Sequence, residues 1–138
     1  EATAEAFTAD GFVRTGDLGH VDRDGYLTIV DRKKDIILRG GENISCLEVE
    51  QAIYAHPAIV EACVFGLPDP RYGEVPCAVY LARPGQAIDG DELRAFLAAH
   101  IAPFKLPARL WQVDRPLPRL GTEKLDRRTI KARYSTAA

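Results

Sequence analysis

Hydrophobic and polar positions divide the chain into two parts with different patterns. In the first, short stretches at 20–22 and 26–30 predict two strands, and Asp24-Gly25 between them favours the tight turn of a β-hairpin. Residues 1–10, which are polar and rich in Ala and Thr, are expected to be a poorly ordered linker. The charged run at 31–35 then separates the hairpin from the next apolar segment, so we expect a boundary between two bodies there.

The second part predicts further strands. Apolar runs occupy 36–38, 59–67 and 75–82, and residues 108–114 are expected to form another strand. The runs at 59–67 and 75–82 are rich in β-branched residues and are bounded by Pro and Gly, which is typical of buried central strands joined by a loop.

Helices are expected between these strands. Ser45 and Glu48 have the spacing of a capping box, in which the serine accepts the amide three residues on and the glutamate reaches back, so a helix should run to about residue 55. Residues 91–101 place apolar side chains at a 3.6-residue period, and Asp126 is expected to cap a final basic helix at 127–134. This alternation predicts an α+β fold with a small mixed β-sheet flanked by helices.

Composition narrows the class of protein. The chain has 138 residues, of which 46% are hydrophobic and 28% charged, and this excludes collagen-like and wholly disordered proteins. It contains no methionine, so we expect it to be a piece of a longer protein.

Charge is distributed unevenly. The net charge is −2, yet residues 103–138 carry nine basic and three acidic side chains. A basic segment of this kind can bind phosphate-bearing ligands or can be a solvated basic helix, and composition does not separate the two.

The cysteines indicate a reducing compartment. Cys46, Cys63 and Cys77 are odd in number and lack CxxC spacing, which argues against a disulfide framework or a zinc site. No apolar run approaches the roughly 18 residues of a membrane span. We therefore expect a cytoplasmic protein with no metal ligands in this chain.

Four clusters carry candidate chemistry: Thr15-Gly16-Asp17, the charged run containing Arg32, the pair Gly40-Gly41, and Lys124 in a Pro- and Gly-bearing loop. Each alone has an ordinary structural explanation, namely a turn, a solvated connection, a loop before a helix, and an exposed lysine.

In this order and spacing the clusters strongly resemble the C-terminal portion of the adenylate-forming enzymes. The resemblance rests on Gly11 to Gly19, on Gly25-Tyr26-Leu27 with Asp31 to Asp35, on Gly40 to Ser45, and on Pro118 to Arg127. It implies that 1–33 is the tail of a large N-terminal domain, ending in the β-hairpin, and that 34–138 is a mobile C-terminal domain. The expected partners are that missing domain and small molecules, with no nucleic acid.

Members of this family activate a carboxylic acid with Mg-ATP to an acyl-adenylate and then pass the acyl group to a thiol. ATP and CoA are thus the expected substrates, and Mg²⁺ is expected in the full-length enzyme with no ligands in this fragment. The fragment alone is expected to be inactive, because the phosphate loop and the carboxylate pocket lie outside it. Which acid is activated is left open, with fatty acid metabolism as one expected setting.

The resemblance assigns roles to individual residues in the first half-reaction. Asp17 would bind the ribose hydroxyls of ATP, Arg32 would contact the same ribose region, and Lys34 would be the hinge about which the domain rotates. Lys124 would be the catalytic lysine that meets the α-phosphate. Glu123 departs from the family, which usually has glycine before this lysine, and its carboxylate could hold the ammonium away or point to solvent.

For the second half-reaction, Gly40 and Gly41 would line the passage for the pantetheine arm, and Lys105 or Arg109 could meet the CoA phosphates. The segment 41–45 resembles CoA ligases rather than peptide-synthetase adenylation domains. We therefore expect an acyl-CoA or aryl-CoA synthetase, with an adenylation domain that loads a carrier protein, or a stand-alone nucleotide- or partner-binding module, as alternatives. A lysine acetyltransferase acting on Lys124 is a further expected partner.

Overall fold

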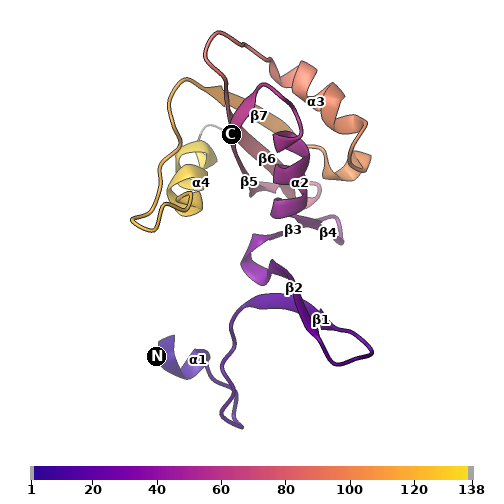
Figure 1. Ribbon diagram of the computed structural model, residues 1–138, viewed down its shortest axis with the longest axis vertical. Helices are drawn as coiled ribbons and strands as arrows, with labels where there is room; N and C mark the ends of the chain where they lie inside the picture. Colours follow the sequence, from indigo (N-terminus) through magenta and orange to yellow (C-terminus); the bar gives the residue numbers. More distant parts are fainter. Residues whose placement is uncertain (1, 137–138) are drawn as a thin grey trace. The chain divides into compact units, whose positions relative to one another are not determined.

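The computed structural model describes residues 2–136, and the chain divides into two compact units (Figure 1), one up to Ile36 and the other from Ile37. The division falls one residue beyond the charged run at 31–35 that the sequence marks as a boundary. The assignment of 1–33 and 34–138 to two named domains stays a prediction.

The first unit contains the expected hairpin. Strands β1 (Asp17–Val21) and β2 (Leu27–Arg32) pair antiparallel, with a register shift at Leu18/Gly19. The turn forms because Asp22 Oδ1 accepts hydrogen bonds from the amides of Asp24 and Tyr26, both at 2.9 Å.

The expectation of a poorly ordered linker at 1–10 is wrong for most of the residues that the structure describes there. Helix α1 spans Ala2–Glu5, and Phe7 pairs with Val13 in an isolated β-bridge. Alanine is the strongest helix former, so a run that composition suggests is unstructured can complete one helical turn. A 3-10 helix, η1 (Lys33–Asp35), follows β2.

The second unit is built on a mixed sheet, as predicted, but the sheet has five strands and the sequence predicted four. Its strands are β3 (Ile36–Arg39), β4 (Glu42–Ser45), β5 (Ile59–Asp69), β6 (Gly73–Ala82) and β7 (Arg109–Val113). The hydrogen-bonded order is β4-β3-β6-β5, and β7 runs parallel to β6 whereas β3 and β5 run antiparallel to it. Strand β4 was not predicted, because its polar sequence resembles a loop.

Three capped helices flank this sheet: α2 (Cys46–Tyr54), α3 (Gly90–Ala98) and α4 (Arg127–Ser135), with the 3-10 helix η2 (Pro103–Lys105) after α3. Ser45 and Asp126 cap α2 and α4 as predicted. Helix α3 begins earlier than predicted, because Asp89 is its cap and accepts the amide of Glu92 at 2.8 Å.

Side chains alternate along β5 and divide the core into two layers. Ala62 and Val64 pack with residues of α2 and α3, whereas Cys63, Phe65 and Leu67 pack with Ile130 of α4. Helices α2 and α3 therefore cover one face of the sheet and α4 covers the other (Figure 1).

The edge of β5 that faces away from β6 is closed by side chains. The Tyr54 hydroxyl accepts from the amide of Ala62 at 3.0 Å and donates to its carbonyl at 3.4 Å. One turn earlier on α2, the carboxylate of Glu50 accepts from the amide of Val64 at 2.9 Å. Side chains of α2 thus supply hydrogen-bond partners to backbone groups of Ala62 and Val64, which would otherwise be buried without a partner.

This arrangement predicts the effect of removing one hydroxyl. Tyr54→Phe leaves the amide and carbonyl of buried Ala62 without this partner, so the free energy of unfolding should fall by about 1–3 kcal/mol. Tyr26→Phe, the same chemical change on the exposed hairpin, is the control and should leave it unchanged. Denaturant unfolding measures both, and equal values for the two variants would contradict the role given to Tyr54.

Candidate functional site

Asp17 and Arg32, which were both predicted to contact nucleotide, are brought together by the hairpin. They are register partners in β1 and β2, and Arg32 Nε donates to Asp17 Oδ1 at 2.9 Å. Their side chains are 29% and 51% exposed, respectively. A partly exposed ion pair contributes only about 0–1 kcal/mol, so a ligand with hydroxyl groups can exchange for it at little cost.

Lys34, the predicted hinge, is an exposed residue in the middle of η1. The amide of Lys33 donates to the carbonyl of Gly16 at 2.8 Å, which ties the start of η1 to the hairpin unit. The division between the units follows two residues after Lys34. Its role in rotation stays a prediction.

Gly40 and Gly41 form the turn between β3 and β4, and both have positive φ, 55° and 88°. The Gly40 amide donates to the Tyr72 carbonyl at 2.8 Å, and a Cβ on Gly40 would lie 3.3 Å from the Tyr72 ring. Apart from Gly41 and its two chain neighbours, no heavy atom of the described residues lies within 4 Å of where a Cβ on Gly41 would be. Both glycines are therefore required by the backbone, and the space over Gly41 is open.

Lys105, a predicted CoA contact, is already engaged by a carboxylate. Its Nζ lies 2.8 Å from both carboxylate oxygens of Glu48. A phosphate would have to replace Glu48 or join it. Arg109, the other predicted contact, is exposed at the start of β7 and lines a shallow pocket with Arg94 and Trp111.

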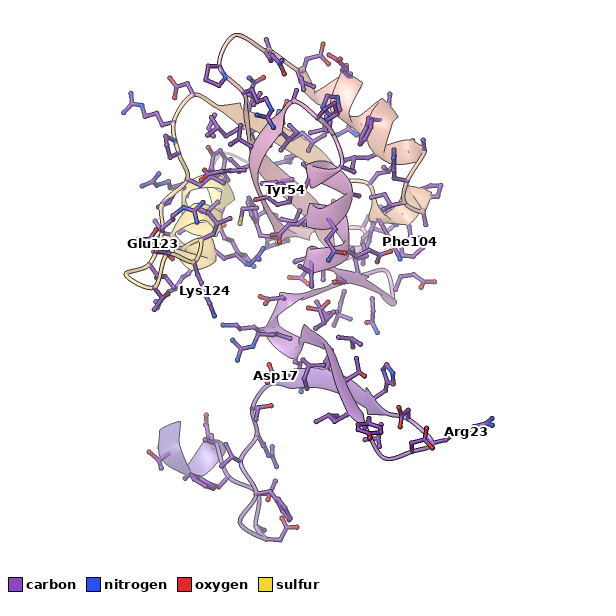
Figure 2. All side chains as sticks on the ribbon, viewed as in Figure 1. Asp17, Arg23, Tyr54, Phe104, Glu123 and Lys124 are labelled. Atoms are coloured by element: carbon purple, nitrogen blue, oxygen red, sulfur yellow. The ribbon has the colours of Figure 1, made fainter. Side chains whose placement is uncertain are left out.

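Lys124, the predicted catalytic residue, projects from an exposed loop just before α4 (Figure 2). The loop is a small hairpin of its own, in which Arg119 pairs with Leu125 in a β-bridge and the Leu120 amide donates to the Lys124 carbonyl at 2.8 Å. At the base of the loop, the Asp126 amide donates to the Pro118 carbonyl at 2.8 Å. The backbone on both sides of Lys124 is thus fixed although its side chain is in solvent.

Two buried glutamates that the sequence analysis did not single out hold this region to the sheet. Glu61 of β5 accepts from the Leu117 amide at 2.8 Å and from Arg119 Nη2 at 2.6 Å. The hydrogen bond to Glu61 raises the pKa of Arg119. Both Leu117 and Arg119 belong to the segment that leads to Lys124.

The second glutamate, Glu50 of α2, pairs with Arg127 in the first turn of α4. Arg127 Nη1 also donates to the Val64 carbonyl at 2.5 Å. Burial works to lower the pKa of Arg127, but the hydrogen bond to Glu50 and the charge of Glu50 outweigh it and raise the pKa. Arg127 therefore keeps its charge and fastens the start of α4 to β5.

One feature of the sequence could have identified Glu61 as a residue with a structural role. It interrupts the apolar run at 59–67, and a carboxylate in a buried strand needs a cationic or amide partner. The sequence does not say which arginine supplies the partner, because Arg119 lies 58 residues away.

The predicted residues of the C-terminal unit do not form one cluster. Phe104, the neighbour of Lys105, packs on the face covered by α2 and α3, whereas Leu125, the neighbour of Lys124, packs on the face covered by α4. Figure 2 shows Phe104 and Lys124 on different sides of this unit. Lys105 and Lys124 therefore belong to segments that pack on different faces of the sheet.

The part of the chain that the structure describes contains no group of three or more His, Cys, Asp or Glu side chains placed to hold a metal ion. We assign no Mg²⁺ ligand to it. None of the helices within residues 2–136 is long and apolar enough to span a membrane. Cys46, Cys63 and Cys77 are buried thiols.

Residues 48–124, more than half of the chain, match the family described as AMP-binding enzyme C-terminal domain. The chain belongs to this family. The match ends at Lys124 and includes the buried strands, Glu61 and Arg119.

Known relatives agree with this membership. The chain is 45% identical over 134 residues to feruloyl-CoA synthase of Amycolatopsis sp, and 44% identical over 134 residues to the fatty acid–[acyl-carrier-protein] ligase ScoC of Streptomyces coeruleorubidus. Each alignment covers 97% of this chain, but only 27% and 25% of the relative. The chain thus spans about a quarter of the length of these proteins.

Among solved structures, ATP-bound MatB from Rhodopseudomonas palustris superposes with a TM-score of 0.88 at 36% sequence identity. The superposition covers 99% of this chain and 27% of MatB. The α+β fold is therefore that of an AMP-binding enzyme C-terminal region.

Glu123, at the position where the resemblance leads us to expect glycine, has a left-handed backbone with φ of 66°. It is the one non-glycine residue with positive φ among residues 2–136. A side chain in this region costs roughly 1–2 kcal/mol, a cost that glycine would avoid. The Glu123 carbonyl accepts from Arg119 Nη1 at 2.7 Å, and this contact helps to hold the unfavourable conformation.

Relieving this strain should stabilise the protein. Glu123→Gly is expected to raise the free energy of unfolding by about 0.5–1 kcal/mol, the gain being reduced by the greater freedom of glycine in the unfolded chain. Glu123→Ala removes the same carboxylate but keeps the strain, so it should give no such gain. Chemical denaturation measures both, and an equal gain in the two variants would show that charge rather than backbone conformation is responsible.

Proposed function

We propose that this chain is the C-terminal part of an acid–CoA ligase, which joins a carboxylic acid to ATP as an acyl-adenylate and then transfers the acyl group to CoA. Membership of the AMP-binding enzyme C-terminal domain family supports the proposal, as does 45% identity to a feruloyl-CoA synthase. The activity belongs to the whole protein, of which this chain supplies about a quarter, so the chain alone should not turn over.

The observation that carries the proposal is the loop of Lys124. Its ends are fixed by backbone hydrogen bonds and by Glu61, while the ammonium stays in solvent. As a carboxylate attacks the α-phosphate of ATP, negative charge accumulates on the phosphate oxygens. A cation held on a fixed backbone stabilises that charge more in the transition state than in the ground state.

Asp17 and Arg32 are proposed to bind the ribose of ATP. A carboxylate can accept hydrogen bonds from two hydroxyl groups at once, and the neighbouring guanidinium can donate to ribose oxygens. Their partial exposure and their existing 2.9 Å contact support this role, because the pair is formed before ligand arrives and remains accessible.

Lys34 is proposed as the hinge between the half-reactions. It is exposed and lies in one turn of 3-10 helix, so its torsions can change without breaking a core. Lys105 and Lys124 lie toward different faces of the sheet. This placement supports a mechanism in which the C-terminal domain rotates and brings first the Lys124 face and then the Lys105 face to the substrates. Gly40, Gly41, Lys105 and Arg109 are proposed to serve the CoA step.

A carrier protein is the alternative acyl acceptor. The similarity to the fatty acid–[acyl-carrier-protein] ligase ScoC supports this alternative. CoA and carrier proteins both present a phosphopantetheine thiol, so the same passage at Gly41 suits either. Thioester formation by the full-length enzyme with CoA or with a phosphopantetheinylated carrier protein distinguishes them.

The remaining proposals concern the setting of the enzyme. Buried thiols support a reducing compartment, for which we propose the cytoplasm. Mg²⁺ would accompany ATP without ligands from this chain. Acetylation of the exposed Lys124 by an acetyltransferase would remove the charge that the adenylation step uses. Fatty acids are one proposed substrate class.

Removal of the Lys124 ammonium should separate the half-reactions. In the full-length enzyme, Lys124→Ala is expected to slow acyl-adenylate formation by about 10²- to 10³-fold and to spare thioester formation from supplied acyl-adenylate. Lys131→Ala, on α4, is the matched control and should affect neither. Pyrophosphate release and thioester formation measure the two steps, and equal losses in both would contradict the role of Lys124.

A side chain at Gly41 should have the opposite effect. Gly41→Leu is expected to block thioester formation while pyrophosphate exchange continues, because the side chain fills the proposed passage. Since Gly41 has φ of 88°, the control must carry the same backbone strain. Gly85→Leu does so, with φ of 78° and equally open space, and should leave both steps intact. Loss of thioester formation in both variants would show that strain, rather than a blocked passage, is the cause.

A further inference from the structure

Lys124 is connected to the sheet by a short chain of charge-assisted hydrogen bonds. Glu61 Oε1 accepts from Arg119 Nη2 at 2.6 Å, and Arg119 Nη1 donates to the Glu123 carbonyl at 2.7 Å. That carbonyl belongs to the peptide group that joins Glu123 to Lys124. One guanidinium therefore bridges a buried strand and the peptide bond that precedes the proposed catalytic lysine.

The first link of this chain is rigid. Glu61 is the third residue of strand β5, its side chain is 12% exposed, and its other oxygen accepts from the Leu117 amide at 2.8 Å. A carboxylate held by two donors has little freedom to rotate. Charge-assisted hydrogen bonds are also about twice as strong as neutral ones, so the guanidinium is held firmly.

The second link, from Arg119 to the Glu123 carbonyl, acts at the residue with the unfavourable positive φ. Glu123 has φ of 66°, and without a restraint this residue would return to the negative φ that side chains prefer. Such a change would rotate the peptide group and redirect the Lys124 side chain. The bond from Arg119 to the Glu123 carbonyl opposes that rotation.

The contact between Arg119 and Glu123 is not the only closure of this loop. The Arg119 side chain is 42% exposed, and the loop is separately closed by the Asp126 amide on the Pro118 carbonyl and the Leu120 amide on the Lys124 carbonyl. Loss of the guanidinium should therefore leave the loop in place while its tip becomes mobile.

We propose that Glu61 and Arg119 are positioning residues, which hold the peptide group before Lys124 so that its ammonium is aimed for the adenylation step. This inference rests on the proposed role of Lys124 in that step. Arg119 acts through the backbone of Glu123 and need not touch the substrate.

The test compares single and double variants of the full-length enzyme. Arg119→Ala should slow acyl-adenylate formation roughly 10- to 100-fold, as expected for a small misplacement of a catalytic group, and leave thioester formation from supplied acyl-adenylate unchanged. Added to Lys124→Ala, it should cause no further loss, because its effect passes through Lys124. Arg115→Ala, an exposed arginine of the same loop, is the matched control and should have no effect on either step.

The conservative variant gives a second readout. Arg119→Lys keeps the charge facing Glu61 but lacks the fork that reaches two acceptors at once, so it should restore only part of the adenylation rate. Full restoration would overturn the bridging role and leave only a need for charge.

The remaining outcomes separate this inference from the function on which it rests. If Lys124→Ala slows adenylation but Arg119→Ala does not, the positioning role fails and the proposed function stands. If Arg119→Ala lowers both half-reactions equally, or lowers adenylation further in the Lys124→Ala background, its role is structural and the inference is wrong. If Lys124→Ala leaves adenylation unchanged, the proposed function itself fails, and the positioning role fails with it.

Discussion

Two carboxylates that are almost withdrawn from water determine how the C-terminal unit closes. Glu50 and Glu61 lie on either side of the start of β5, and each is far too costly to bury without a partner. Their partners, Arg127 and Arg119, come 77 and 58 residues later in the chain. The last segment of the chain therefore has to return to β5, where Arg119 and Arg127 reach these carboxylates with side chains that are still 42% and 31% exposed.

This pairing also determines where flexibility remains. Arg127 fixes the first turn of α4, and Glu61 fixes the segment that enters the loop. Between these anchors the chain makes one small hairpin with Lys124 near its tip. A long lysine side chain on a firmly held base can search for a phosphate without any movement of the sheet beneath it.

Local signals predicted much of the fold from the sequence. The Asp-Gly turn, the caps at Ser45 and Asp126, and the β-branched runs each act within a few residues, and each element they predict is present. Strand β4 was missed because its pairing with β3 depends on the positive φ of Gly40 and Gly41, which makes a polar segment continue the sheet. The short helix α1 was missed because a composition typical of linkers is also rich in alanine.

The candidate site was predictable only in part. Motif order singled out Asp17, Arg32 and Lys124 as candidates, and the hairpin joins the first two. The support of Lys124 was not visible, because nothing near Arg119 in the sequence points to a glutamate 58 residues earlier. The consequence of Glu123 was also hidden, since its effect arises from backbone torsion rather than from the charge that the sequence displays.

The closed edge of β5 has a further consequence for a unit proposed to rotate. An outer strand with unpaired amides and carbonyls is a template on which another polypeptide can add as an extra strand, which leads to domain swapping and aggregation. Here Tyr54, Glu50 and Arg127 occupy those groups at Ala62 and Val64. In the proposed rotation the unit would meet several different surfaces, and side chains that occupy this part of the edge would prevent an extra strand from pairing with it there.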